Sequence, residues 1–337
     1  AGGLRAVGSV LSCEDFQILL LLDRDLNDKV SSAYLMVEPW KLLEALDKKM
    51  NSLNPNINKL AIKIMEEGPD LSTDTDIANV PKGQPAVEHK LETDDIVTVW
   101  GPPGTGKTYT MAKIANSYIA QGKSVLIVSH SNVSVDGVIK QVVKMLGTDK
   151  QSILEDGKIL RFGYVRDDEL SQNPYATSFN YALSKCDSYA RQLEHLMAKR
   201  DELRAKNQMK SKEYDEVEHK IKEIRGEIRK EERKYVERAQ VIGTTISRAT
   251  IDPMFEERQF DLVMFDEVSM AYVPQVIAAA ALAKEKFMCV GDFRQLAPIS
   301  QSPDSRVLQV DIFSCLQIVD GKGNMYWHPW LVMLNEQ

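Results

Sequence analysis

The chain has 337 residues, of which 43% are hydrophobic and 27% are charged, and its formal net charge is −7. This composition is ordinary for a globular protein, and the length allows two or three domains. The negative net charge argues against indiscriminate nucleic-acid binding but is compatible with a local basic path. No apolar run in the sequence is long enough to span a membrane.

The cysteines are few and scattered. They stand at positions 13, 186, 289 and 315, and no two form a C-x-x-C pair. Disulfide bonds and a zinc site are therefore not expected. We expect a reducing compartment, which is the cytoplasm or, in a eukaryote, the nucleus. No signal-like N-terminus is present, so we do not expect secretion. The chain begins at Ala1 without an initiator Met, which predicts a processed or recombinant fragment.

The region before residue 84 carries no recognisable chemistry. Strand-like pieces separated by polar turns favour a small β-barrel or sheet, and they lie at residues 6–13, 16–22 and 32–37. Helical spacing then predicts two helices over 39–50 and 57–67. Residues 70–85 are polar and rich in Asp, Thr and Pro, which is typical of a linker.

The first chemical motif follows a predicted buried strand, Ile96–Trp100, and precedes a predicted helix over 109–119. It matches G-x-x-x-x-G-K-[ST], a phosphate-binding loop, and its residues are Gly101, Pro102, Pro103, Gly104, Thr105, Gly106, Lys107 and Thr108. The glycines let backbone N–H groups turn toward phosphates. Lys107 would reach the β- and γ-phosphates, and Thr108 would bind Mg²⁺. A simple Gly/Pro turn between strand and helix is the alternative.

Further strands and helices alternate after the loop, as in a parallel α/β sheet. A buried strand is predicted over 124–129. It is followed by the polar segment 130–136, a helix that ends at Leu146, and a short strand over 159–163.

The stretch from 179 to 238 is charged and nearly free of Gly and Pro. Its apolar residues form two coiled-coil stripes, Tyr189, Leu193, Leu196 and Leu203 in the first half and Tyr214, Val217, Ile221, Ile224 and Ile228 in the second. With a turn at Asn207-Gln208, they predict an inserted antiparallel helical hairpin. From Lys199 to Arg238 the chain has 14 basic and 11 acidic residues. This balance suits either a solvated arm or an arm that touches nucleic acid.

Two more strands are predicted over 240–244 and 262–265, and the second runs into Asp266-Glu267. An acidic pair at the end of a buried strand is what a nucleotide hydrolase places opposite its phosphate loop. Asp266 would bind Mg²⁺, and Glu267 would orient and deprotonate the attacking water. An acidic cap on the following helix is the alternative.

A last predicted strand ends at Gly291-Asp292, and Gln295 lies in the loop after it. In a parallel sheet this loop lies at the same edge as the other active loops. The uncharged Gln295 can hydrogen-bond a γ-phosphate oxygen or the attacking water without competing for the metal. Lys107, Glu267 and Gln295 are therefore the predicted catalytic residues.

Five segments resemble, in order, motifs I, Ia, Ic, II and III of superfamily 1 helicases, namely Gly101–Thr108, Ser129–Asp136, Gly243–Thr245, Asp266–Ser269 and Gly291–Pro298. The resemblance is to the Upf-like branch, covers residues 84–337, and implies an ATPase that moves 5′ to 3′ on single-stranded DNA or RNA. It also implies an α/β, RecA-like P-loop NTPase fold, a parallel sheet flanked by helices.

The resemblance divides the chain into four regions. Residues 1–83 form a β-barrel-like region with stalk helices and a linker, and residues 84–178 form the first part of the RecA-like domain. The inserted hairpin covers 179–238, and the second part of the RecA-like domain covers 239–337. Ser131 and Asn132, with Thr244 and Thr245, match positions that grip the nucleic-acid backbone, which small hydroxyl and amide groups suit. Gln84, 17 residues before Gly101, resembles the adenine-reading glutamine.

The end of the chain, Leu334–Gln337, resembles the start of the family's Leu-x-Glu-Gln-Tyr-Arg segment. The resemblance thus implies a cut before the second RecA-like domain and its arginine fingers. Because such a finger is worth about 10³–10⁵ in kcat, the chain alone is expected to bind ATP and Mg²⁺ but to hydrolyse poorly.

A phosphate-binding loop is also compatible with three other functions. A regulatory GTPase would need an Asn-Lys-x-Asp loop late in the domain, whereas Asn58–Ala61 lacks the Asp and precedes the phosphate loop. A small-molecule kinase would lack the acidic pair followed by a Gly-Asp-x-x-Gln loop. An ATP-gated clamp without unwinding activity, which binds nucleic acid or docks a protein on the hairpin, remains an alternative. The choice between DNA and RNA also stays open.

Overall fold

The computed structural model describes residues 6, 8–14, 17–22, 40–67, 76–147, 150–206, 208, 211–299 and 309–335. The chain divides into two compact units, residues 1–41 and 42–337. In the first unit, β1 (Gly8–Glu14) and β2 (Gln17–Leu22) pair antiparallel. Two of the three predicted strands are thus confirmed. The third, 32–37, lies outside the described residues, and the barrel stays a prediction.

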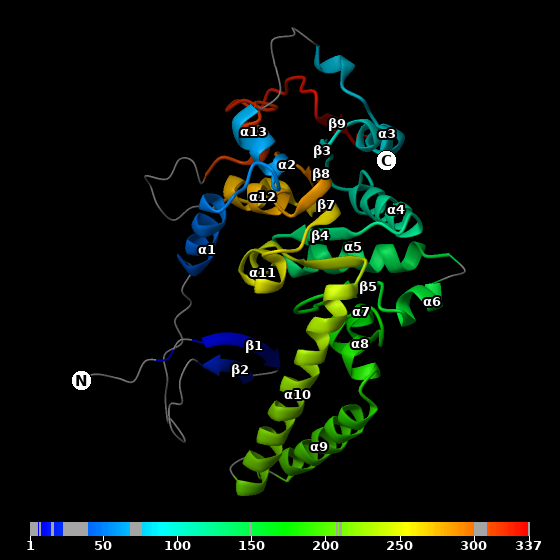
Figure 1. Cartoon of the computed structure of the whole chain (residues 1–337), viewed down its shortest axis with the longest axis vertical. Helices are drawn as coiled ribbons and strands as arrows, with labels where there is room; N and C mark the ends of the chain where they lie inside the picture. The colour runs from blue at the N-terminus through cyan, green and yellow to red at the C-terminus, as the bar shows by residue number, and fades with distance from the viewer. Residues whose placement is uncertain are drawn as a thin grey trace, which may run out of the picture. The chain divides into compact units, whose positions relative to one another are not determined.

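The second unit is built on a seven-stranded parallel sheet (Figure 1). Its strand order is β5-β6-β4-β7-β8-β3-β9, and every neighbouring pair is parallel. The strands are β3 (Ile96–Trp100), β4 (Val125–Ser129), β5 (Ile159–Arg161), β6 (Val241–Thr245), β7 (Phe260–Asp266), β8 (Ala283–Gly291) and β9 (Leu331–Met333). Most of their side chains are buried on both faces, as parallel strands under two helical layers require, and the exceptions lie mainly at the start of β8.

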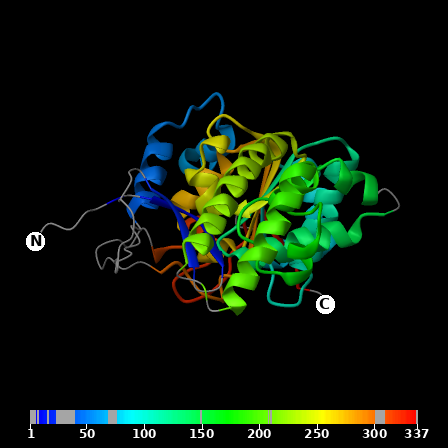
Figure 2. The ribbon, with the colours of Figure 1, turned by 90° about the horizontal axis from the view of Figure 1, so that it is seen from below.

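Helices cover both faces of this sheet (Figures 1 and 2). One layer contains α3 (Gln84–Thr93), α4 (Lys107–Ala120), α5 (Asn132–Met145), α6 (Lys150–Glu155) and α7 (Asp168–Gln172). The other contains α2 (Lys59–Ile62) with the π-helical turn Lys63–Glu67, α11 (Ile246–Ile251), α12 (Val273–Ala280) and α13 (Ile312–Cys315). The predicted class, a parallel sheet flanked by helices, is confirmed.

Apart from a helical arm, one helix and three short turns are the remaining elements of the described chain. They are α1 (Trp40–Asn51) and the 3₁₀ turns Ile77–Asn79, Pro253–Phe255 and Val268–Met270. The predicted stalk helices over 39–50 and 57–67 therefore correspond to α1 and to α2 with its π-helical turn. The second begins two residues later than predicted.

A helical arm projects from the sheet edge that carries β5 and β6 (Figure 1). Its helices are α8 (Ser178–Ser184), α9 (Asp187–Ala205) and α10 (Lys212–Arg238). All five apolar residues of the predicted seam in α10 are buried, and they pack with Leu193 and Leu203 of α9. Lys199 of α9 pairs with Glu213 near the start of α10 at 2.7 Å, which fixes an antiparallel arrangement. The predicted hairpin is confirmed, with α8 added at its base.

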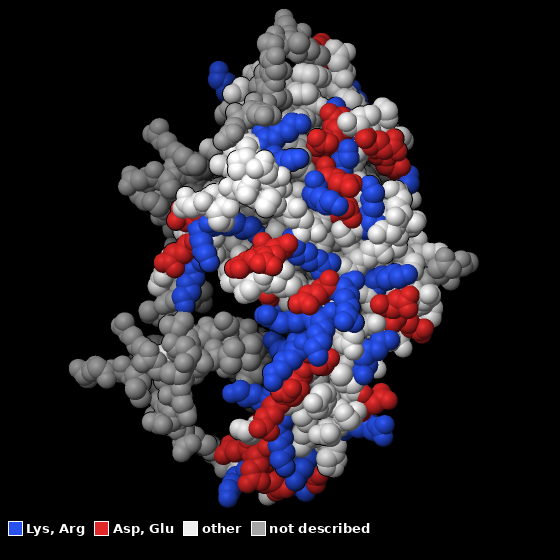
Figure 3. All heavy atoms as spheres, in the orientation of Figure 1, with Lys and Arg blue, Asp and Glu red and all other residues white. Residues whose placement is uncertain are grey.

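Basic side chains concentrate on one part of this arm. In Figure 3, Lys and Arg gather where α10 meets the sheet, and acidic side chains mix with them toward the other end. The arm is therefore not evenly charged, although its two signs nearly balance in the sequence.

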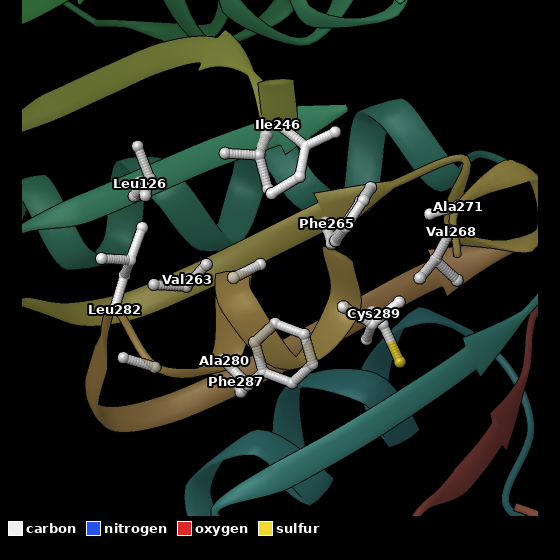
Figure 4. Close-up of a cluster of buried hydrophobic side chains, with 14 of the residues drawn as sticks. Leu126, Ile246, Val263, Phe265, Val268, Ala271, Ala280, Leu282, Phe287 and Cys289 are labelled. Atoms are coloured by element: carbon white, nitrogen blue, oxygen red, sulfur yellow. The ribbon is translucent and has the colours of Figure 1, made fainter. Parts of the chain in front are cut away.

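The largest core lies between the sheet and the layer formed by α2, α11, α12 and α13. Figure 4 shows part of it, where Phe265 of β7 and Phe287 and Cys289 of β8 lie on one face of the sheet and belong to the same cluster as Ile246 of α11. All four are at most 1% exposed. Burial at this density fixes the spacing of the strand ends that carry the candidate site.

The structure corrects the predicted linker over 70–85 in its described part. Residues 76–85 fold onto the seven-stranded sheet, because the Gly83 N–H donates to the Met333 carbonyl at 2.8 Å and the Met333 N–H donates to the Pro81 carbonyl at 2.9 Å. Gln84 and Pro85 then open α3. A proline is tolerated in a first helical turn, where its missing N–H has no partner to lose, so Pro85 here starts a helix.

Strand β9 was not predicted. It pairs with β3 at the sheet edge, and the Leu334 N–H donates to the Trp100 carbonyl at 2.8 Å. Three residues are too few to show an alternating pattern in the sequence.

His328, just before β9, makes the stability of this edge depend on pH. It is 1% exposed, its Nδ1 accepts from the Trp330 N–H at 3.1 Å, and its ring lies edge-on to Trp330. Burial lowers the His328 pKa to about 4 from 6.5, with a smaller effect of Lys90. The unfolded chain therefore takes up a proton near pH 6.5, whereas the folded protein does so only near pH 4.

We therefore expect the free energy of unfolding to fall by about 3 kcal/mol from His328 alone as the pH drops from 6.5 to 4. Urea unfolding at several pH values measures this. His328→Asn, whose amide oxygen can accept from Trp330 but does not titrate, should lose that part of the pH dependence. The exposed His89→Asn is the control. Equal acid sensitivity in His328→Asn and the unaltered chain would contradict the assignment.

Candidate nucleotide and nucleic-acid site

The predicted site residues, which lie far apart in the sequence, meet at one edge of the sheet. Parallel strands end on the same side, and the register places Trp100 of β3 beside Gly291 of β8. Ser129 at the end of β4 lies beside both Thr245 of β6 and Asp266 of β7. The segments that follow these strands therefore form one continuous row, the arrangement expected for ligand sites in open α/β sheets.

The phosphate loop turns sharply between β3 and α4. Gly104 and Gly106 have φ values of 83° and 82°, a left-handed conformation that favours glycine. Lys107 opens the 14-residue helix α4, so the loop ends at a helix N-terminus, which favours anions. The Lys107 ammonium donates to the carbonyls of Gly101 and Pro102 at 2.7 and 3.2 Å. The lysine is thus already folded over the loop.

Gln84 lies against this loop. A Cβ built on Gly106 would come within 2.9 Å of the Gln84 side-chain nitrogen. Gln84 is held there by the start of α3, which Gly83 ties to β9. The structure thus places the Gln84 amide beside the phosphate loop.

The acidic pair ends β7. Asp266 is 5% exposed, and its carboxylate accepts from the Ser134 hydroxyl at 2.5 Å. Burial raises the pKa of Asp266, the Ser134 hydrogen bond opposes the rise, and Glu267 and Lys107 add smaller effects of opposite sign. Only β8 separates β7 from β3 in the sheet, so the acidic pair and the phosphate loop follow strands that end near one another at the same edge.

Glu267 has an unusual backbone. Its φ and ψ are 54° and 38°, one of two non-glycine residues with positive φ in the described chain. Such conformations cost energy and gather at functional sites. The half-buried Glu267 carboxylate accepts from the Ser131 hydroxyl at 3.3 Å.

These residues fit a magnesium–nucleotide complex. The Thr108 side chain is exposed at the start of α4, and Asp266 supplies one carboxylate. Among the described residues no group of three or more His, Cys, Asp or Glu could hold a metal by itself. Mg²⁺ is usually held by one or two carboxylates together with waters and substrate phosphates, so a small donor set is what it needs.

Gln295 is held by the residue that ends the neighbouring strand. Its side-chain nitrogen donates to Asp292 at 3.1 Å, and the other oxygen of Asp292 accepts from the Trp100 indole at 3.0 Å. The Gly101 N–H donates to the Gly291 carbonyl at 3.1 Å. Asp292, which carried no predicted role, therefore joins the loop of Gln295 to the strand that starts the phosphate loop.

The four predicted nucleic-acid residues differ in accessibility. Ser131 and Thr245 cap α5 and α11, accepting from the N–H groups of Ser134 and Arg248. Asn132 is half-buried, whereas Thr244 is fully buried and its hydroxyl has no partner among the described residues. The side chains of Ser131, Asn132 and Thr245 therefore reach the surface at this edge, whereas the Thr244 side chain does not.

A buried ion pair behind Asn132 was not predicted. Arg161 and Asp136 are 0% and 1% exposed, and their Nε–Oδ1 distance is 2.6 Å. Arg161 also donates to the Asn132 side chain at 2.8 Å and to the Tyr164 carbonyl at 2.6 Å. The pair therefore locks the first turn of α5 to the end of β5. No spacing in the sequence links Arg161 to this turn.

Comparison with known proteins finds similarity over most of the chain. A family model described as an AAA domain matches residues 82–303. The chain is 27% identical over 236 residues to DNA-binding protein SMUBP-2 of Mesocricetus auratus, covering 66% of this chain and 22% of that protein. It is 25% identical over 233 residues to DNA polymerase alpha-associated DNA helicase A of Saccharomyces cerevisiae, covering 63% and 32%.

A third relative is the regulator of nonsense transcripts 1 homolog of Arabidopsis thaliana, 26% identical over 213 residues, covering 60% of this chain and 15% of that protein. The chain spans less than a third of the length of each of these three relatives. Within the described residues, no helix has the length and apolar character to cross a membrane.

Proposed function

The chain belongs to the AAA domain family and, among superfamily 1 helicases, to the Upf-like group, and on that premise we propose that it is the first motor domain of an ATP-driven nucleic-acid helicase or translocase. One observation carries the proposal. The phosphate loop, the acidic pair, Gln295 and the capped turns of α5 and α11 all lie along one sheet edge. A nucleotide site and a nucleic-acid site are then adjacent, as coupling between them requires.

In this proposal the phosphate loop binds the triphosphate of ATP through its N–H groups and through Lys107, which exchanges its loop carbonyls for phosphate oxygens. Thr108 and Asp266 would hold Mg²⁺, which supplies charge stabilisation on the phosphates. Glu267 accepts a proton from the attacking water, and Gln295 orients the water or a γ-phosphate oxygen. Gln84 would contact the base.

Ser131, Asn132 and Thr245 would hold the phosphates of a single strand. Hydroxyl and amide groups with helix N-termini suit this task, because they bind phosphate without reading sequence. The buried Thr244 would act through its backbone. The basic part of α10 in Figure 3 lies on the same body and could extend the contact surface for a polyanion.

The experiment that tests the proposal measures ATP hydrolysis by the natural full-length protein with and without single-stranded DNA or RNA. We expect one polymer to stimulate hydrolysis and the stimulation to vanish in Glu267→Gln. Directional movement is then measured on a labelled strand of that polymer. Stimulation with no directional movement would favour the second candidate below.

The second candidate is an ATP-gated clamp without unwinding activity, in which the arm docks a protein. The observation that favours it is the arm itself, because α9 and α10 pack on each other through their own apolar cluster and extend away from the sheet. It predicts partner binding that depends on ATP and is lost when the seam is disrupted. Unwinding by the full-length protein would exclude it as the whole function.

A further inference from the structure

The first turn of α5 supplies one serine to each member of the acidic pair. The Ser134 hydroxyl donates to Asp266 at 2.5 Å, and the Ser131 hydroxyl donates to Glu267 at 3.3 Å. Both contacts follow from the sheet, since Ser129 at the end of β4 lies beside Asp266 at the end of β7. The segment expected to touch nucleic acid thus also touches the residue expected to activate water.

The Ser131 hydroxyl has only one hydrogen to donate. Its oxygen already accepts from the Ser134 N–H at 3.1 Å as the cap of α5, and its hydrogen is directed to Glu267. A serine can donate to one acceptor at a time. A nucleic-acid phosphate that takes the Ser131 hydrogen must therefore take it from Glu267.

The backbone of Glu267 is held in place, so only its side chain can change direction when its hydrogen-bond partner changes. Its left-handed conformation is followed directly by a 3₁₀ turn, in which the Met270 N–H donates to the Glu267 carbonyl at 3.1 Å. With the backbone held, the direction of the carboxylate depends on its hydrogen-bond partner. In the described structure that partner is Ser131, on α5.

We propose that Ser131 is a positioning residue that restrains Glu267 until nucleic acid binds. The inference rests on the proposed function, and it concerns how hydrolysis at that same site is regulated. A phosphate of the single strand accepts the Ser131 hydroxyl, favoured there by the N-terminus of the 14-residue helix α5. Glu267 loses its hydrogen bond to α5 and is released to accept a proton from water. Hydrolysis thereby becomes dependent on nucleic acid.

The test is Ser131→Ala in the natural full-length protein. We expect kcat for ATP without nucleic acid to rise several-fold with the KM for ATP unchanged, because the restraint is gone and the phosphate loop is intact. The stimulation ratio should fall correspondingly. Ser131→Thr keeps both the hydrogen donor and the capping oxygen, so it should restore a low basal rate and full stimulation.

Ser211→Ala is the matched control for loss of a helix cap. Ser211 caps α10 with the same 3.1 Å contact to an N–H three residues on, and it lies outside the site. It should leave both rates unchanged.

The failures can be told apart. If nucleic acid stimulates the unaltered protein but Ser131→Ala shows the same basal rate, or a lower one, the inference is overturned and the proposed function stands. If neither polymer stimulates the unaltered protein, the proposed function fails, and the inference fails with it.

Discussion

Replacing Glu267 with Gln is expected to lower the rate of ATP hydrolysis by about 10²–10⁴-fold, the contribution typical of a general base. Gln matches Glu in size and can still accept the Ser131 hydrogen bond, but its amide cannot take up a proton. Among the residues that the structure describes, no hydrogen bond joins the Glu267 side chain to the phosphate loop, so ATP affinity should change little. Single-turnover hydrolysis and titration with a fluorescent ATP analogue measure the two quantities separately.

Glu257→Gln is the matched control, since Glu257 is exposed and precedes β7 rather than ending it. Its rate should equal that of the unaltered protein. A Glu267→Gln variant that hydrolyses ATP at an undiminished rate would remove Glu267 from the chemical step. A variant that loses ATP binding as well would indicate a structural role.

The second large effect concerns stability. Arg161→Met should lower the free energy of unfolding by about 3–5 kcal/mol, the usual cost of leaving one member of a buried ion pair alone. Asp136 would keep its contacts to the N–H groups of Arg166 and Asp167 but would remain a buried carboxylate without a cation. Urea unfolding monitored by circular dichroism measures the change.

Two further variants sharpen this test. Arg161→Met combined with Asp136→Leu should recover much of the lost stability, because no unpaired charge is left behind. Lys230→Met breaks the exposed pair of Lys230 with Glu227, 2.6 Å apart, and should change stability far less. If Arg161→Met proves as mild as Lys230→Met, the buried pair does not hold the turn of α5. Weaker binding of single strands by the double variant would show that Asn132 needs its partner.

Much of the site could be predicted because its chemistry is local in the sequence. The residues of the phosphate loop are consecutive in the sequence, and so are Asp266 and Glu267. Each of these two motifs follows a strand that the sequence shows as an apolar run. The arm was predictable for a different reason, since the α10 seam repeats at a coiled-coil spacing and all its members are buried. In both cases the pattern and the structure depend on the same few neighbouring residues.

The unpredicted features depend on contacts between distant residues. Arg161 pairs with Asp136 only because β5 ends beside α5. Ser134 hydrogen-bonds Asp266 only because β4 and β7 are neighbours in the sheet. Strand β9 is too short to show a period. The composition around Pro85 favours a linker, whereas its actual position in a first helical turn depends on the contact of Gly83 with β9.

The position of β9 has a mechanical consequence. This strand runs parallel to β3, and beyond it the Leu334 N–H holds the Trp100 carbonyl at 2.8 Å, immediately before the phosphate loop. A Cβ on Gly101 would lie 3.0 Å from that of Leu334, so the two backbones are in close contact. Tension along the backbone through β9 would therefore load the β3–β9 hydrogen bonds in shear, next to the candidate phosphate-binding loop. A pull on β9 would then reach the backbone at the start of that loop through only a few hydrogen bonds.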